Sequence, residues 1–151
     1  MTEIGRLLLV DDSPQDTELI LDALEEFRVA NEIVCLRDGV EALDYLYRRQ
    51  DFAGRPEGHP SVVLLDLKMP RVDGLEVLRQ VKGDPELKRI PIVVMTSSRE
   101  EKDLLRSYEL GVNAYVVKPL DFSQFTEAIR AVGAFWGVVN HPPPESGKGR
   151  L

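Results

Sequence analysis

Four short apolar runs, each ending on a polar side chain, constrain most strongly what this chain can fold into. Residues 7–10 lead into Asp11 and Asp12, residues 62–65 into Asp66, residues 92–95 into Thr96, and residues 115–117 into Lys118. Uninterrupted runs of Val, Ile and Leu are typical of strands buried on both faces of a parallel sheet. Because such strands all point the same way, we expect these polar groups to meet at the carboxyl edge, where open α/β sheets bind ligands.

Length, charge and cysteine content limit the class of protein. The 151 residues suffice for one domain, and the net charge of −7 argues against direct binding to nucleic acid, whose phosphates attract basic surfaces. The single Cys35 excludes an internal disulfide and suits a reducing compartment. The N-terminus lacks the basic segment of a signal peptide, and no apolar run approaches the roughly 20 residues that span a bilayer. We therefore expect a cytoplasmic protein without a nucleic-acid or membrane partner.

Strand and helix patterns alternate five times along the chain, which predicts an α/β fold with a doubly wound, five-stranded parallel sheet. Ser13 with Pro14 is expected to open the first helix, and Ser98 with Glu101 to form a capping box at the fourth. Residues 49–60 are polar and rich in Gly and Pro, so we expect a loop there. The predicted domain spans residues 1–139, and residues 140–151 are expected to form a disordered tail.

The convergence of Asp11, Asp12 and Asp66 would be costly without a counter-charge. Two carboxylates about 4 Å apart repel by roughly 4 kcal/mol at an effective dielectric constant of about 20. Lys118 would offset part of this repulsion, and a hard cation would offset most of the rest. Oxygen ligands with no His or Cys nearby fit Mg²⁺, which leaves coordination positions for water and phosphate. A carboxylate beside such a cation can attack a phosphoryl group and form an aspartyl phosphate.

Sequence motifs covering residues 6–137 closely resemble the receiver domain of two-component response regulators. The matching stretches are LLLVDDS, VVLLDLKMPRVDGLEVL, IPIVVMTSS and GVNAYVVKPLD. The resemblance implies a flavodoxin-like (βα)5 fold with strand order 2-1-3-4-5. It also implies a protein that is not an enzyme for external substrates and catalyses only phosphoryl transfer to, and hydrolysis from, its own aspartate.

The resemblance assigns the phosphoryl chemistry to four residues. Asp66 would accept the phosphoryl group, Thr96 and Lys118 would contact it, and the backbone N–H of Ser97 would do the same. A switch is also implied, in which Thr96 moves toward the phosphoryl group and Tyr115 turns inward to fill the vacated space.

The resemblance further assigns Mg²⁺ to Asp11, Asp12, Asp66 and the backbone carbonyl of Lys68, and it implies a cis peptide bond before Pro119. Independently, we expect the Lys68 side chain to lean over the site. Our hypothesis is that its charge pairs with the phosphoryl group and changes the lifetime of the phosphorylated state.

The last helix carries more apolar residues than one core-facing stripe needs. The expected stripe consists of Phe122, Phe125, Ile129 and Val132. Phe135 and Trp136 follow it, and they either close the core or form a partner surface. The resemblance favours a homodimer through the fourth predicted helix, the strand over residues 115–117 and the last helix. The DLKMP motif, the long loop over residues 49–60 and the aromatic end of the last helix look most like single-domain regulators paired with phytochrome-type histidine kinases.

Two other functions compete with a receiver that accepts a phosphoryl group from a histidine kinase or phosphotransfer protein. A phosphatase of the haloacid-dehalogenase type also uses an aspartyl phosphate, but its nucleophile lies on the first strand with a second acid two residues later. Here the acids after residue 10 are adjacent. A receiver fold could also serve as a binding module without phosphorylation, although no residue needed for phosphorylation is missing.

Overall fold

One parallel sheet of five strands forms the centre of the molecule. The computed structural model describes residues 6–25 and 32–135. The strand order is β2-β1-β3-β4-β5, which confirms the predicted fold class. The strands are β1 (Leu7–Val10), β2 (Ile33–Leu36), β3 (Val62–Leu65), β4 (Ile92–Thr96) and β5 (Ala114–Val117).

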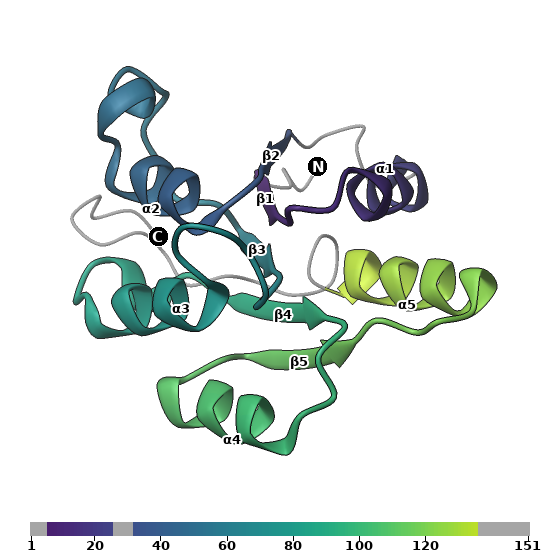
Figure 1. The fold of residues 1–151 in the computed structure, drawn as a ribbon. Helices are drawn as coiled ribbons and strands as arrows, with labels where there is room; N and C mark the ends of the chain where they lie inside the picture. Colours follow the sequence, from purple (N-terminus) through teal and green to yellow (C-terminus); the bar gives the residue numbers. More distant parts are fainter. Residues whose placement is uncertain (1–5, 26–31, 136–151) are drawn as a thin grey trace.

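Helices cover both faces of the sheet (Figure 1). On one face, α1 (Pro14–Ala23) packs beside α5 (Phe122–Ala134). The other face carries α2 (Gly39–Tyr47), α3 (Gly74–Gly83) and α4 (Glu101–Leu110), and two short 3₁₀ helices, η2 (Gln50–Phe52) and η3 (Leu87–Arg89), complete the fold. None of the described helices combines the length and apolar character needed to cross a membrane.

The burial of the strands follows their place in the sheet. Every residue of β1, β3 and β4 is buried, as expected from their uninterrupted apolar runs, whereas every residue of the edge strand β5 is only partly buried. Alternate residues of the central strands enter the two apolar clusters on opposite faces, so that Leu8 joins one cluster and Leu9 the other.

Side-chain caps fix the start of most helices. The Ser13 hydroxyl accepts a hydrogen bond from the Asp16 N–H, as predicted, and the Asp121 carboxylate accepts one from the Gln124 N–H. The capping box predicted for α4 is wrong. The residue that precedes α4 is Glu100, and its side chain makes no capping hydrogen bond. Ser98 lies two residues earlier, and its hydroxyl donates to the carboxylate of Asp103 at 2.5 Å.

Two further expectations are corrected by the structure. Phe122 does not belong to the core stripe: it opens α5 and is 70% exposed, so the buried stripe begins with Phe125. The peptide bond before Pro119 is trans, as are all described peptide bonds. An amide before proline permits either isomer with a difference of about 0.5–1 kcal/mol, so the sequence does not fix this choice.

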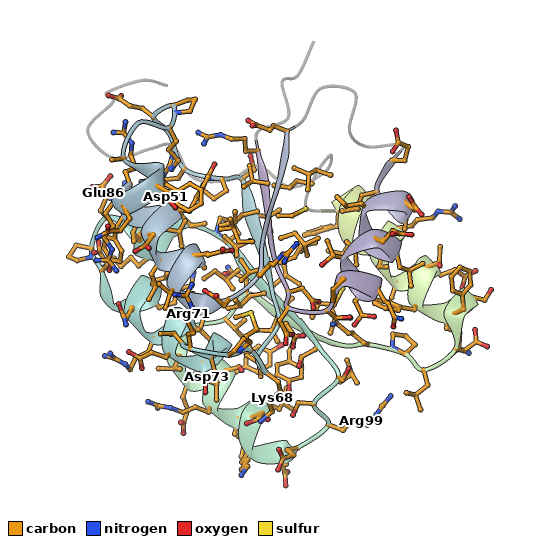
Figure 2. All side chains as sticks on the ribbon, turned by 45° about the horizontal axis from the view of Figure 1, so that its top comes forward. Asp51, Lys68, Arg71, Asp73, Glu86 and Arg99 are labelled. Carbon is orange, nitrogen blue, oxygen red and sulfur yellow. The ribbon has the colours of Figure 1, made fainter. Side chains whose placement is uncertain are left out.

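The segment expected to be a plain loop, residues 49–60, docks against α2. Besides the short helix η2, it contains Arg55, whose buried guanidinium stacks 4.2 Å from the centre of the Tyr45 ring and donates to the Tyr45 carbonyl. Figure 2 shows that Asp51, in this segment, lies at the end of the molecule opposite Lys68 and Arg99. The segment therefore supports the amino edge of the sheet and is remote from the predicted site. The expected tail over residues 140–151 lies outside the described residues.

The first residue of α3 packs directly against the predicted acceptor. A Cβ atom added to Gly74 would lie 2.2 Å from the carbonyl oxygen of Asp66, whereas one added to Gly83, at the other end of α3, would meet nothing within 4 Å. We expect Gly74→Ala to lower the free energy of unfolding by about 2–3 kcal/mol through overpacking. Gly83→Ala should leave it unchanged or raise it by up to about 1 kcal/mol. Urea denaturation measures both, and equal stabilities would contradict the close approach.

Candidate functional site

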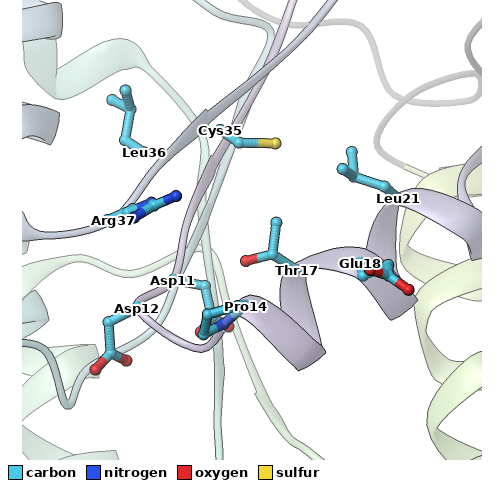
Figure 3. A pocket seen from close by; sticks show the side chains of 9 residues that line it. All are labelled: Asp11, Asp12, Pro14, Thr17, Glu18, Leu21, Cys35, Leu36 and Arg37. Carbon is cyan, nitrogen blue, oxygen red and sulfur yellow. The ribbon is translucent and has the colours of Figure 1, made fainter.

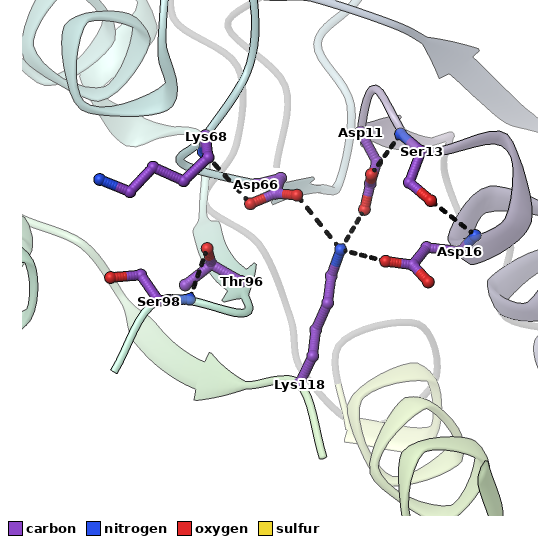
Figure 4. A network of polar contacts seen from close by, with 8 residues as sticks. All are labelled: Asp11, Ser13, Asp16, Asp66, Lys68, Thr96, Ser98 and Lys118. Atoms are coloured by element: carbon purple, nitrogen blue, oxygen red, sulfur yellow. Dashed lines mark hydrogen bonds and ion pairs between the residues drawn. The ribbon is translucent and has the colours of Figure 1, made fainter. Parts of the chain in front are cut away.

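Polar side chains from three strand ends meet at the carboxyl edge of the sheet (Figure 4). The Lys118 ammonium, which follows β5, lies 2.7 Å from Asp11 Oδ2 and 3.2 Å from Asp66 Oδ2. Asp11 follows β1 and Asp66 follows β3, and all three residues are buried. The structure thus brings together residues that lie up to 107 positions apart in the chain.

Backbone pairing explains why these residues lie side by side. In the register of the sheet, Val10 is paired with Leu65, so the residues that follow them are also neighbours. The ladder of hydrogen bonds continues beyond the strands, because the Asp66 N–H donates to the Val10 carbonyl and the Lys118 N–H to the Thr96 carbonyl. Parallel strands therefore fix the positions of Asp66, the neighbouring Asp11 and Lys118 independently of any ligand.

The three predicted acids form a cluster that fits a divalent cation. One carboxylate oxygen from each of Asp11, Asp12 and Asp66 lies within 4.8 Å of the others. Asp11 and Asp66 are buried and Asp12 is exposed, so a cation would have protein oxygens on one side and water on the other. This all-oxygen, partly solvated set is what a hard cation such as Mg²⁺ requires. The carbonyl of Lys68 as a further ligand stays a prediction.

A cavity of about 370 Å³ adjoins this cluster (Figure 3). Asp11 and Asp12 line one side of it, and the first turns of α1 and the end of β2 line the rest, including Thr17, Cys35 and Arg37. Asp66 is not among the lining residues. The cavity therefore gives access to the acids of the β1–α1 connection and is separate from the predicted acceptor.

Lys118 keeps its positive charge in this buried position. Burial alone would lower the pKa of its ammonium, but hydrogen bonds to Asp11 and Asp16 and the charge of Asp66 outweigh burial and raise the pKa above its ordinary value. The site therefore holds a permanent cation next to Asp66, which could stabilise negative charge that develops on a group bound there.

Asp16 is part of the site, although the sequence analysis did not single it out. Its Oδ2 lies 2.8 Å from the Lys118 ammonium, and its side chain is 31% exposed. Ser13 caps α1 at the sheet edge, so the third residue of that helix faces the site. An acid at that position was the available signal, but acids are common there because they complement the helix dipole.

The predicted switch residues surround the loop between β4 and α4. Thr96 is fully buried, and its hydroxyl accepts a hydrogen bond from the Ser98 N–H at 3.2 Å, while Ser97 is exposed. Tyr115 packs against the core, and its hydroxyl donates to the Ser98 carbonyl at 3.2 Å. The Tyr115 side chain is thus turned inward, toward the loop that follows β4. The predicted role of Thr96 and Tyr115 as a switch stays a prediction.

The Lys68 side chain does not lean over Asp66 in this structure. Its backbone N–H contacts Asp66 Oδ1 at 3.3 Å, but its ammonium pairs with Asp103 at 3.3 Å and with Glu100 at 3.7 Å. Figure 4 shows Lys68 and Lys118 on opposite sides of the Asp66 carboxylate. The pairing of Lys68 with a phosphoryl group stays a hypothesis, and Asp103 is a partner that the sequence interpretation missed.

The predicted interface residues are only partly described. Phe135 follows α5 and is 48% exposed, whereas Trp136 lies outside the described residues. A second exposed apolar group lies on α4, where Leu104, Leu105 and Tyr108 are 39%, 59% and 53% exposed. The apolar pattern of the sequence did not single out α4 as a surface, although the family resemblance implied a dimer that includes this helix.

Comparison with known proteins identifies the family. The model of the response regulator receiver domain matches residues 7–130. The curated Response regulator Rcp1 of Synechocystis sp. is 38% identical over 130 residues, which cover 86% of this chain and 87% of Rcp1. The crystal structure of the Mn²⁺-bound form of Rcp1 has a TM-score of 0.87 and covers 92% of this chain and 99% of that chain.

Two solved structures connect the chain with phytochrome regulators. The phosphorylated cyanobacterial phytochrome response regulator RcpA is 38% identical, with a TM-score of 0.88, and the match covers 95% of this chain and 100% of that chain. The bacteriophytochrome response regulator AtBRR is 58% identical, with a TM-score of 0.72 and coverage of 93% and 100%. The sub-family resemblance predicted from sequence is thereby confirmed.

Metal binding should appear as stabilisation that depends on the acidic cluster. A divalent cation at about 100 times its Kd should raise the free energy of unfolding by about 2.7 kcal/mol. Asp12→Asn should remove most of this gain and, because one repelling charge is lost, should raise the stability of the metal-free protein. Thermal unfolding with and without Mg²⁺ or Mn²⁺ measures both effects. The matched control is Asp22→Asn, an exposed acid of α1 that does not line the cavity, and an equal loss of metal response in that variant would refute the assignment.

Proposed function

Because the chain belongs to the response regulator receiver domain family, we propose that it accepts a phosphoryl group onto Asp66 from a phosphohistidine, supported by Mg²⁺. The observation that carries the proposal is the buried contact of the Asp66 carboxylate with the Lys118 ammonium, beside two further acids within 4.8 Å. Receiver domains of this family are signalling proteins that work with histidine kinases, so the chemistry proposed here is confined to the chain's own aspartate.

Each residue of the site has a defined part in the transfer. A carboxylate oxygen of Asp66 bonds to phosphorus while the bond from phosphorus to the imidazole nitrogen breaks. The phosphohistidine ring, which carries a proton on its other nitrogen, leaves as neutral imidazole with the electron pair of the broken bond. Lys118 neutralises one phosphoryl oxygen, and the Thr96 hydroxyl and Ser97 N–H bind others. Mg²⁺, held by Asp11, Asp12, Asp66 and the Lys68 carbonyl, would supply the remaining positive charge. Attack by water on phosphorus later releases inorganic phosphate and restores Asp66.

The partner we propose is a histidine kinase of the phytochrome type. Support comes from the two solved relatives described as phytochrome response regulators, which are 38% and 58% identical to this chain. The reaction would take place in the cytoplasm, where the exposed Cys35 stays reduced. The receiver family gives no support to the haloacid-dehalogenase alternative.

Incubation with acetyl phosphate and Mg²⁺ tests the acceptor directly. We expect the intact mass to increase by one phosphoryl group and the increase to disappear with excess chelator, because the cation offsets the charge brought together at the site. Asp66→Asn should show no increase, whereas Asp121→Asn, which changes an exposed acid by the same atoms, should behave like the unaltered chain. An unmodified mass for the unaltered chain would favour the phosphorylation-independent binding module.

We propose that the output surface lies at the β5 edge of the sheet, between α4 and α5, and that it forms a homodimer. The support is apolar exposure at this edge. On α4 the buried positions hold Asp103 and Ser107, while Leu105 and Tyr108 face outward, so its polarity is reversed relative to a helix that only covers a core. Phe135 adds an exposed aromatic ring next to α5.

Truncating the aromatic anchor should weaken the dimer. We expect Phe135→Ala to raise the dimer dissociation constant about tenfold, the effect of losing a well-packed interface aromatic. Phe122→Ala, an exposed phenylalanine at the other end of α5, should change it less than about twofold by the same reasoning. Sedimentation equilibrium of the phosphorylated and unphosphorylated protein provides the constants. A monomeric mass in both states would refute the dimer.

A further inference from the structure

The buried positions of α4 carry polar side chains. Asp103, in the first turn, is only 4% exposed, and one turn later the hydroxyl of Ser107 is buried without a hydrogen-bond partner among the described residues. A buried carboxylate is stable only when it is paired and hydrogen-bonded. The partners of Asp103 therefore determine where the start of α4 can lie.

Two side chains satisfy Asp103, and they come from two different loops. The Ser98 hydroxyl donates to Asp103 Oδ2 at 2.5 Å, and the Lys68 ammonium lies 3.3 Å from the same oxygen. Lys68 also lies 3.7 Å from Glu100, but that carboxylate is 54% exposed and so holds its partner weakly. Asp103 is thus the point at which the β3–α3 loop and the β4–α4 loop are joined to α4.

Both loops are part of the phosphoryl site. Lys68 follows the acceptor by two residues, and its N–H contacts Asp66 Oδ1 at 3.3 Å. The Ser98 N–H donates to the Thr96 hydroxyl at 3.2 Å, and the Ser98 carbonyl accepts from the Tyr115 hydroxyl. A change of charge at Asp66 therefore acts on each group that holds Asp103.

A phosphoryl group adds negative charge that Lys118 alone does not neutralise. Lys118 already contacts three carboxylates, and a phosphoryl group brings a further charge of about −1.5 to −2. Lys68 begins in the acceptor loop, and its side chain is flexible and 60% exposed, so its ammonium can rotate from one anion to another.

We infer that Asp103 is a positioning residue that holds Lys68 away from the acceptor, and that phosphorylation of Asp66 transfers Lys68 from Asp103 to the phosphoryl oxygens. The inference rests on the proposed function and deepens it. Once Lys68 has left, Asp103 keeps only the Ser98 hydroxyl, and the start of α4, which has no side-chain cap of its own, is released. The exposed apolar residues of α4 then move with it.

Binding of beryllofluoride, a stable stand-in for the phosphoryl group, tests this exchange in a double-mutant cycle. Affinity in the presence of Mg²⁺ is measured by fluorine NMR for the unaltered chain, Asp103→Asn, Lys68→Gln and the double variant. Because Asp103→Asn removes the competing anion, it should tighten binding by about two- to fivefold, the range of an ion pair with one exposed partner. In the Lys68→Gln background the same substitution should give no gain. Glu100→Gln, the exposed neighbour, should alter affinity less than about twofold.

The outcomes separate this inference from the proposed function. If the unaltered chain takes up no beryllofluoride, the proposed acceptor fails and the inference fails with it. If it binds, but Asp103→Asn is no tighter or gains equally without Lys68, the inference alone is overturned. A structure of the unaltered chain with beryllofluoride gives a second test that does not depend on the folding of any variant. The Lys68 ammonium must contact fluorine and leave Asp103, and an intact Lys68–Asp103 pair would refute the exchange.

Discussion

The contact of one buried ammonium with three carboxylates is the interaction on which the rest of this structure depends. Lys118 joins the ends of β1, β3 and β5 to the first turn of α1, through residues that lie 52 to 107 positions away. Without it, buried Asp11 and Asp66 would be left as uncompensated charges, a defect that costs several kcal/mol in a protein interior. The same contacts that stabilise these buried carboxylates also give Asp66, the proposed acceptor, a permanent counter-charge, so stability and the proposed chemistry depend on one residue.

The sheet and its carboxyl edge could be predicted from the sequence because strands that are buried on both faces consist of uninterrupted apolar residues. The runs before Asp11 and Asp66 contain no polar residue, and the direction of parallel strands then fixes where those acids must lie. Asp16, Ser98 and Asp103 could not be assigned in the same way. Acids and hydroxyls near helix starts usually serve as caps, and only the tertiary structure decides whether they turn toward their own backbone or toward a neighbouring loop.

Asp66, the proposed acceptor, is flanked by two lysines with different freedom. Lys118 is 5% exposed and fixed by three anions, whereas Lys68 is exposed and held by a single buried one (Figure 4). A fixed cation suits catalysis, since it needs no rearrangement when charge develops. A mobile cation suits communication, since its position reports the charge at the acceptor. The inward position of Tyr115 fits this division, because the tyrosine contacts the carbonyl of Ser98 and so belongs to the mobile side.

The reversed polarity of α4 has a consequence for how such a protein can acquire new partners. Leu104, Leu105 and Tyr108 face outward and contribute little to either apolar cluster, whereas the buried side chains of the helix are small or charged. Substitutions on the outer face can therefore alter recognition with almost no change in folding free energy. The central strands are under the opposite restriction, because every side chain there is packed on all sides. Partner recognition and folding stability thus depend on separate residues, and each can change in evolution without the other.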